Sequence, residues 1–173
     1  MKEIPLHGKK AAGRVALVDD EDYELVSQYH WHVSETARPG MRLPGIYARA
    51  MLPRRDGRRP SIRMHVLIMG GRGIDHVDHD GLNNQRHNLR AADQQQNSRN
   101  RRPSAGGSSD FKGVRWHKQR RKWEAVIGVG GKARYLGLFA DERLAALAYN
   151  AAASELFGEF ACLNEVGMSA GAA

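Results

Sequence analysis

A short connector of small residues most constrains what this chain can fold into. Residues 103 to 109 read PSAGGSS, a proline, glycine and serine composition that is typical of a flexible segment between folded parts. The length of 173 residues allows either one domain or two small ones. The connector therefore predicts two folded parts, one that ends at residue 102 and one that begins at residue 110.

The part after the connector predicts a three-stranded antiparallel sheet packed on one helix. Three runs of β-type residues, FKGVRW, KWEAVIGV and ARYLGLF, are separated by a basic turn and by Gly130-Gly131. Asp141 is a suitable cap for a helix that continues to about Phe157 and stops at Gly158. We expect this domain to cover residues 110 to 166, before a disordered tail at 167 to 173. The apolar residues expected on the packed face of the helix are Leu144, Leu147, Ala148, Ala151, Ala152 and Leu156.

Residues 1 to 70 predict a small α+β unit. RVALV alternates as a strand, and Asp19 or Asp20 can cap a helix over residues 21 to 29. The runs IYARAML and SIRMHVLIM indicate further strands or short helices. Three glycines between residues 70 and 73 end this pattern, so the overall fold class is α+β.

Residues 75 to 97, DHVDHDGLNNQRHNLRAADQQQN, concentrate Asp, His and Asn side chains in a turn-rich segment. Hydrolysis of a phosphodiester needs a base that takes a proton from water and a cation that neutralises developing charge. Both Asp75-His76 and Asp78-His79 offer a possible metal ligand beside a possible base. A single Asp-His pair more often belongs to a turn. The combined spacing of the segment nevertheless predicts a nuclease site built on one of the two pairs.

Positive charge is concentrated after this segment. The net charge is +8 and the pI about 10, which favours nucleic acid or an anionic membrane surface as partner. Between residues 98 and 134 there are eleven Lys or Arg and two acids, a net charge of +9. Trp116, Trp123 and Tyr135 lie among these charges, and a merely solvated loop does not need aromatic residues. This region therefore predicts a phosphate-binding surface.

Cysteine content and hydropathy predict a cytoplasmic protein without a membrane partner. Cys162 is the single cysteine, so the chain can form neither an intramolecular disulfide nor a Cys-rich zinc site. No apolar run approaches the length of a membrane span, and the first ten residues lack the apolar core of a secretory signal.

Three runs carry a family resemblance in the first part: MHVLIMG at 64 to 70, IDHVDHDGLNNQRHNLR at 74 to 90, and the following QQQNSRN. They resemble the HNH nuclease family, the ββα-metal group that includes phage and intron homing endonucleases. The resemblance implies a ββα-metal core over residues 71 to 102, completed by residues 1 to 70. It implies His76 as general base, Asn88 as the residue that braces the hairpin, and Asp75 and Asn97 as metal ligands. Oxygen ligands of this kind suit Mg²⁺ or Mn²⁺.

The second Asp-His pair gives an alternative frame, in which Asp78 is the ligand and His79 the base. Counting from His76 aligns the family pattern without a gap at Gly81, Leu82, Asn84 and Asn88. We therefore prefer the first frame and expect His79 in the turn. His65 resembles the histidine that opens the motif region of the family, but its apolar neighbours are equally compatible with a packed core histidine.

Residues 110 to 166 carry a second resemblance, through FKGVRW, KWEAVI, ARYLGLF, ERLAALAYNAAASELFG and the LN at 163 and 164. These runs resemble the plant ethylene-response-factor (APETALA-type) DNA-binding domain, whose sheet enters the major groove. The plant pattern has Arg where this chain has Lys112 and His117, and Trp where this chain has Tyr135. The DNA sequence preference of the plant domain is therefore not transferred. Trp116 and Trp123 can either face bases or cover the helix. The contacts implied are Lys112, Arg115, Trp116, His117, Arg134 and Tyr135, with Arg99, Arg101 and Arg102 following phosphates.

Together the two resemblances predict a metal-dependent DNA endonuclease of homing type, encoded by a bacterial host or a phage. It would hydrolyse phosphodiester bonds in double-stranded DNA at a site selected by the C-terminal domain. Two alternatives belong to other classes: a non-catalytic DNA-binding transcriptional regulator with a degenerate nuclease domain, and an RNA-binding or RNA-cleaving protein. The sequence leaves open the target site, a nick or a double-strand break, and a monomer or a weak dimer.

Overall fold

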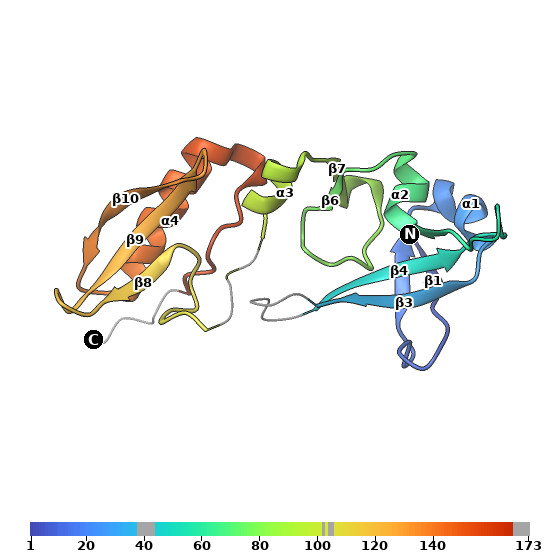
Figure 1. The fold of residues 1–173 in the computed structure, drawn as a ribbon, viewed down its shortest axis with the longest axis horizontal. Coiled ribbons are helices and arrows are strands. Elements are labelled where there is room, and N and C mark those ends of the chain that lie inside the picture. Colours follow the sequence, from blue (N-terminus) through green and yellow to red (C-terminus); the bar gives the residue numbers. More distant parts are fainter. Residues whose placement is uncertain (38–43, 102, 104–105, 168–173) are drawn as a thin grey trace. The chain divides into compact units, whose positions relative to one another are not determined.

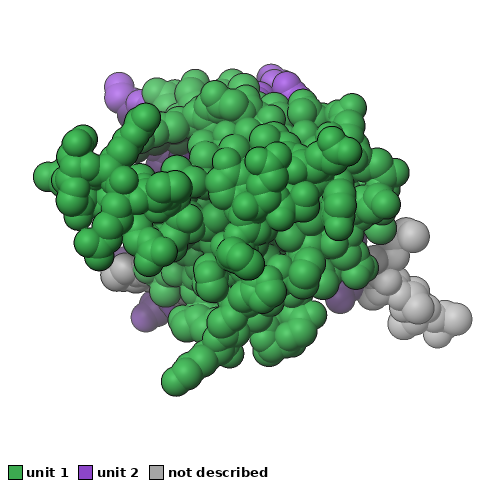
Figure 2. All heavy atoms as spheres, turned by 90° about the vertical axis from the view of Figure 1, so that its right-hand side faces the viewer, with its two compact units in different colours: residues 1–39, 43–97 green, residues 40–42, 98–173 purple. Residues whose placement is uncertain are grey.

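The computed structural model describes residues 1–37, 44–101, 103 and 106–167, and its elements are shown in Figure 1. The chain divides after Asn97 into two compact units, coloured green and purple in Figure 2. Within the described ranges, no helix is long and apolar enough to cross a membrane. The predicted limits of the connector and of the domains stay predictions. Arg102 and residues 168–173 lie outside the described residues.

The first unit is built from small antiparallel sheets and short helices. Strand β1 pairs with β2, and a second sheet has the order β3-β4-β5. Helix α2 follows β5 directly and ends at Gly70, whose φ of 66° suits glycine. The elements of this part are β1 (Lys2–Pro5), β2 (Val15–Val18), a 3-10 turn (Asp20–Asp22), α1 (Tyr23–Ser27), β3 (Trp31–Thr36), β4 (Gly45–Met51), β5 (Ser61–Arg63) and α2 (Met64–Met69).

One apolar core holds these elements together. Trp31, Val18, Val26 and Met64 are fully buried in it. The indole Nε1 of Trp31 donates a hydrogen bond to the backbone oxygen of Val26 at 2.8 Å, so the polar end of this buried ring has a partner. This core fixes β3 and α2 relative to each other, and the candidate site described below is built on that frame.

The Asp/His/Asn segment forms a hairpin followed by a helix. Strand β6 (Ile74–His76) pairs antiparallel with β7 (Leu89–Ala91), and α3 (Gln94–Arg99) follows. The loop between the strands contains a 3-10 turn, Arg86–Asn88, and attaches to β2 through two backbone hydrogen bonds of 2.8 Å with Leu17. The guanidinium of Arg86 also donates to both carboxylate oxygens of the buried Asp22, at 2.9 and 2.7 Å. The N-terminal region therefore supports the hairpin loop directly.

The second unit is a three-stranded antiparallel sheet with one helix packed on it. The strands β8 (Val114–His117), β9 (Lys122–Val129) and β10 (Lys132–Phe139) have the order β10-β9-β8. Helix α4 (Glu142–Phe157) is capped by Asp141, whose carboxylate accepts from the backbone nitrogens of Arg143 and Leu144. A 3-10 turn, Gly158–Phe160, follows it. The predicted α+β class with small antiparallel sheets is confirmed.

The packed face of α4 was only partly predicted from the sequence. Ala148, Ala152 and Leu156 lie against the core as expected, but Leu144 and Leu147 are 52% and 49% exposed and Ala151 is exposed too. The prediction was wrong for these three because apolar residues are often left at a surface, so their presence alone does not identify the packed face. The fully packed stripe is instead formed by Ala145, Ala146, Tyr149, Ala153 and Phe157.

Replacing Gly113 with alanine is expected to destabilise the second unit by about 2–4 kcal/mol, because overpacking and a positive φ act together. A Cβ at Gly113 would lie 2.1 Å from the Tyr149 ring and 2.6 Å from the Val126 oxygen, at a φ of 75°. Gly128→Ala is the matched control, since nothing lies within 4 Å of its Cβ position. Denaturant unfolding should show a large loss of unfolding free energy for Gly113→Ala and none of that size for Gly128→Ala. Equal midpoints for the two variants would contradict the packing described.

Candidate active site

Three aromatic side chains from three different elements meet beside the hairpin. The rings of His65 on α2 and His76 on β6 lie edge to face, with centroids 4.7 Å apart and an interplanar angle of 86°. Tyr47 on β4 contacts both, at 5.8 Å from His65 and 5.9 Å from His76. Both histidines are buried, with 4% and 5% of their surface exposed. The cluster therefore fixes the orientation of the His76 imidazole.

Asp75 and Arg90 form a cross-strand ion pair next to this cluster. The two residues are direct partners in the β6-β7 register, and the Arg90 guanidinium donates to the Asp75 carboxylate at 3.1 Å. Both side chains are nearly buried, with 11% and 12% exposed. A carboxylate this far from water needs a nearby cation or hydrogen-bond donors to offset the loss of solvent. Arg90 supplies that cation in the described structure.

The Asn88 side chain holds the loop of the hairpin closed. Its Oδ1 accepts from the backbone nitrogen of Asp78 at 3.0 Å, and its Nδ2 donates to the Asp78 carboxylate and to the Asn83 oxygen, both at 2.8 Å. The Asp78 carboxylate also accepts from Asn83 Nδ2 and from the backbone nitrogen of Asp80. Asn88 thus occupies its donor and acceptor groups within the loop, a geometry that suits a bracing role.

The loop also lies very close to β4. A Cβ at Gly81 would be 2.1 Å from the backbone oxygen of Ile46 and 2.6 Å from the Tyr47 ring. Glycine is therefore required there for the loop to pack against the strand that carries Tyr47. Asn84, fully buried, donates from Nδ2 to the Leu82 oxygen at 3.0 Å. These contacts set the distance between the loop and the ring cluster.

Burial favours the neutral form of both histidines. Burial is the main cause that lowers the pKa of His76, and the Asn84 side chain and the carboxylates of Asp78 and Asp75 oppose it. Burial also lowers the pKa of His65 to about 3, with smaller contributions from His76 and Arg63. A neutral imidazole near neutral pH is the form that can accept a proton.

The buried His65 predicts a loss of stability in acid. Its folded pKa of about 3 lies below the unfolded value of about 6.5, so between these values only the unfolded chain binds the proton. The free energy of unfolding is therefore unaffected by titration of His65 above about pH 6.5. As the pH falls toward 3, it decreases by up to about 1.4 kcal/mol per pH unit. The free energy of unfolding, measured over this pH range, should decline less steeply for His65→Phe than for the unaltered protein. Equal slopes for the two proteins would contradict this titration.

The second Asp-His pair occupies different surroundings. Partial burial raises the pKa of Asp78, but hydrogen bonds from Asp80, Asn83 and Asn88 lower it more, so the pKa is lowered overall. The Asp78 carboxylate is thus a structural acceptor of the loop. His79 has a φ of 65° and its backbone nitrogen donates to the His76 oxygen at 3.2 Å, as in a turn. The second pair thus belongs to the loop and its turn, and the frame that starts at Asp75 stays a prediction.

The predicted metal ligands are an aspartate in the hairpin and an asparagine on the following helix. Asn97 is exposed on α3, where its backbone nitrogen donates to the Asp93 oxygen at 2.9 Å. The described residues contain no group of three or more His, Cys, Asp or Glu side chains that could hold a metal ion. The donor chemistry nevertheless fits a hard cation, since a carboxylate and an amide oxygen are the ligand types that Mg²⁺ prefers.

Three of the predicted nucleic-acid contacts lie on the sheet face opposite α4. Arg115 and Tyr135 are exposed, and His117 is half-buried. Arg115 pairs with Glu124, whose carboxylate it contacts at 2.7 Å, and these two residues are direct partners in the β8-β9 register. Tyr135 is paired with Val126, two positions along β9 from Glu124, so it shares this face. Two of the three side chains are thus exposed on this face.

Trp116 and Arg134 lie on the other side of the sheet. Trp116 shares its face with the buried Val114, and its ring lies 5.0 Å from that of Trp123, edge to face. Arg134 pairs with Ile127, which is buried against α4. Trp116 thus partly covers the helix side, one of the two arrangements considered from the sequence. The DNA contacts of Trp116 and Arg134 stay predictions, and a position on the helix side of the sheet does not favour them.

The basic residues before the sheet pack within the second unit. The Lys112 ammonium donates to the backbone oxygens of Arg99 and Arg101, and burial lowers its pKa. The Arg99 guanidinium lies over the Phe157 ring, 4.9 Å from its centroid. Lys112 therefore positions the segment at 99 to 101 in this structure, and a phosphate contact would require it to leave these oxygens. Arg101 is exposed.

Sequence reasoning missed two residues of the site. Arg90 could have been found from the hairpin, because the register that pairs His76 with Leu89 also pairs Asp75 with Arg90. No sequence signal identifies Tyr47, since it reaches the histidines only through the packing of β4 against the loop.

Known proteins match both parts of the chain. The uncharacterized HNH endonuclease L560 of Acanthamoeba polyphaga mimivirus is 32% identical over 162 residues, which cover 91% of this chain and 78% of the viral protein. Protein 3.8 of Escherichia phage T7 is 37% identical over 65 residues, 54% of its own length. The AP2-like ethylene-responsive transcription factor AIL7 of Arabidopsis thaliana is 45% identical over 69 residues, and these cover only 14% of that protein.

Neither a family model nor a solved structure matches the chain. The viral relative shares about a third of its residues with this chain over most of both proteins, and the segment at 75 to 97 has the hairpin, loop brace and helix order described above. The chain belongs to the HNH endonuclease family.

Proposed function

We propose that this protein cuts double-stranded DNA by metal-assisted hydrolysis, with His76 as the general base. The observation that carries the proposal is the buried imidazole of His76, which contacts His65 and Tyr47, is adjacent in sequence to the Asp75 carboxylate, and has its pKa lowered by burial. The His76 imidazole is the group proposed to accept a proton from water. The resulting hydroxide would attack the phosphorus in line with the departing oxygen.

Asp75 and Asn97 are proposed to hold Mg²⁺ or Mn²⁺ through one carboxylate and one amide oxygen, in a ββα-metal core. A divalent cation bound there would neutralise charge on the phosphate and on the leaving oxygen. Asn88 positions the loop, and Arg90 balances the charge of Asp75 when no substrate is bound. Two protein ligands leave coordination positions for water and phosphate.

The second unit is proposed to select the site, as in a homing endonuclease. A relative that matches this chain over 69 residues is named as a transcription factor, and the outer sheet face of the second unit presents Arg115, His117 and Tyr135. Arginine can read guanine through two parallel hydrogen bonds, and the other residues would position the backbone. Opening of the Arg115–Glu124 ion pair would free the guanidinium for this contact.

The test is incubation of the protein with duplex DNA, single-stranded DNA and structured RNA, each with Mg²⁺, with Mn²⁺ and with chelator. We expect cleavage of duplex DNA only in the presence of metal. Tight duplex binding without cleavage under any metal would support the transcriptional regulator instead, and preferential cleavage of RNA would overturn the proposed substrate.

A further inference from the structure

A second cationic surface lies on the first unit, in the connection between β4 and β5. Residues 49 to 63 contain six arginines and one aspartate, a net charge of +5. Arg54, Arg55, Arg58 and Arg59 are all exposed. We call these four residues the arginine turn.

The arginine turn is a tight hairpin. The backbone nitrogens of Arg55 and Arg58 each donate to the other residue's oxygen at 2.8 Å, and the central residues Asp56 and Gly57 have φ of 48° and 72°. Two positive φ angles in a two-residue Asp-Gly loop are typical of a type I′ turn, which joins antiparallel strands closely. The turn thus presents its arginines from a fixed backbone.

Like charges face each other across this turn. Arg55 and Arg58 form an antiparallel bridge, so their side chains leave the same face of the ladder, and direct opposition of like charges is unfavourable. Within the described part of the chain, none of the four arginines forms an ion pair with an acid. An anion supplied by another molecule would remove this repulsion.

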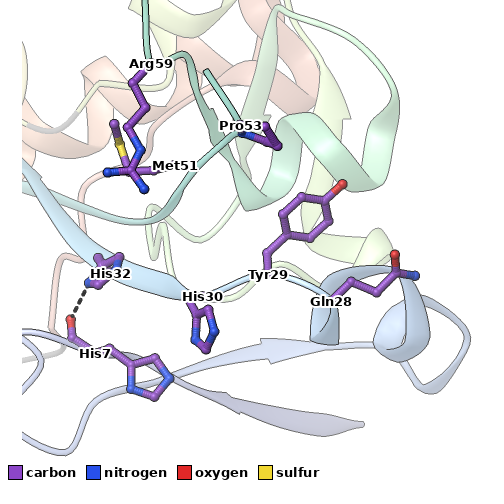
Figure 3. A pocket seen from close by; sticks show the side chains of 8 residues that line it. All are labelled: His7, Gln28, Tyr29, His30, His32, Met51, Pro53 and Arg59. Carbon is purple, nitrogen blue, oxygen red and sulfur yellow. Dashed lines mark hydrogen bonds between the residues drawn. The ribbon is translucent and has the colours of Figure 1, made fainter. Parts of the chain in front are cut away.

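Two adjacent hollows provide room for such an anion. One, of about 540 Å³, is lined by Arg59 together with His7, His30 and His32, and the other is lined by Arg54, Arg55 and Arg58. Gln28, Tyr29 and Pro53 border both hollows. In the view of Figure 3, Arg59 and Met51 are drawn above the imidazoles of His30 and His32, and all four residues line the first hollow. Donors from three separate chain segments therefore surround one space.

We propose that the arginine turn binds backbone phosphates of the DNA substrate and so gives the first unit an anchor of its own. The inference rests on the proposed function for the identity of the polyanion. Arginine suits it because the planar guanidinium can donate two hydrogen bonds to one phosphate. The predicted phosphate contacts of the second unit are separate from this surface in sequence.

The test measures binding of the full chain to a labelled random-sequence duplex at several salt concentrations, in chelator. Each phosphate contact contributes about −0.9 to the slope of log affinity against log salt. Arg55→Ala/Arg58→Ala should weaken binding and reduce the magnitude of the slope by about two. Lys2→Ala/Lys9→Ala is the matched control, because it removes two exposed charges of the same unit outside the hollows.

Unchanged binding by the arginine variant, or an equal loss in both double variants, would overturn the proposal. A loss of affinity for single-stranded RNA but not for duplex would assign the surface to RNA and would also overturn it. The melting temperature of the arginine variant should be unchanged or slightly raised, which separates a binding defect from misfolding. Because binding in chelator does not require cleavage, a failure of the nuclease proposal would not alter this result.

Discussion

Replacing His76 with alanine is expected to lower the single-turnover rate of DNA cleavage by about 10²- to 10⁴-fold, the usual effect of removing a positioned base. The imidazole is held between His65 and Tyr47, and its burial favours the neutral form. Because the pKa of His76 is lowered, the cleavage rate of the unaltered protein should already be independent of this group at neutral pH. The rate should fall only in more acidic solution.

DNA binding separates a catalytic role of His76 from a structural one. The predicted contacts with DNA lie in the second unit and in the arginine turn, so the His76→Ala variant should bind duplex with the affinity of the unaltered protein. His76→Ala with unchanged binding and an unchanged cleavage rate would exclude His76 as the base. Loss of binding together with loss of cooperative unfolding would point to a collapsed hairpin instead.

Replacing Asp75 with alanine is expected to abolish cleavage and to destabilise the first unit by about 3–5 kcal/mol. The stability loss follows because the nearly buried Arg90 would keep its charge without the carboxylate that it contacts at 3.1 Å. The loss of cleavage follows from the proposed role of Asp75 as a metal ligand. Denaturant unfolding and plasmid cleavage measure the two effects separately.

The double variant Asp75→Ala/Arg90→Met removes both charges and resolves the two roles. Replacement of a buried ion pair by apolar groups is often neutral, so most of the lost stability should return. Cleavage should not return, since the carboxylate is still absent. If the double variant regained cleavage as well as stability, Asp75 would affect cleavage only through its ion pair with Arg90.

Local patterns predicted much of the fold. The run KWEAVIGV is β9, the runs FKGVRW and ARYLGLF cover β8 and β10 except for one residue at one end of each strand, and Asp141 and Gly158 flank α4 as their chemistry indicates. Such features depend on neighbouring residues alone, and so a sequence reveals them. The nuclease assignment was likewise confirmed at the level of the family.

Features that depend on packing and register could not be predicted in the same way. The exposed side of α4 was misassigned because leucines occur on both of its faces, and only contact with the sheet distinguishes them. Tyr47 joins the histidines through the approach of Gly81 to β4. Lys112 binds backbone oxygens of the preceding segment. The resemblance to the plant domain implies a DNA contact for this residue and does not reveal the internal one.

The most direct test of the central claim is conversion of supercoiled plasmid by the unaltered protein, His76→Ala and His79→Ala under identical conditions with Mg²⁺. The account predicts conversion by the unaltered protein and by His79→Ala, conversion at least about 100-fold slower by His76→Ala, and none by any sample with chelator. Conversion by His76→Ala at the rate of the unaltered protein, or loss of conversion only in His79→Ala, would contradict it.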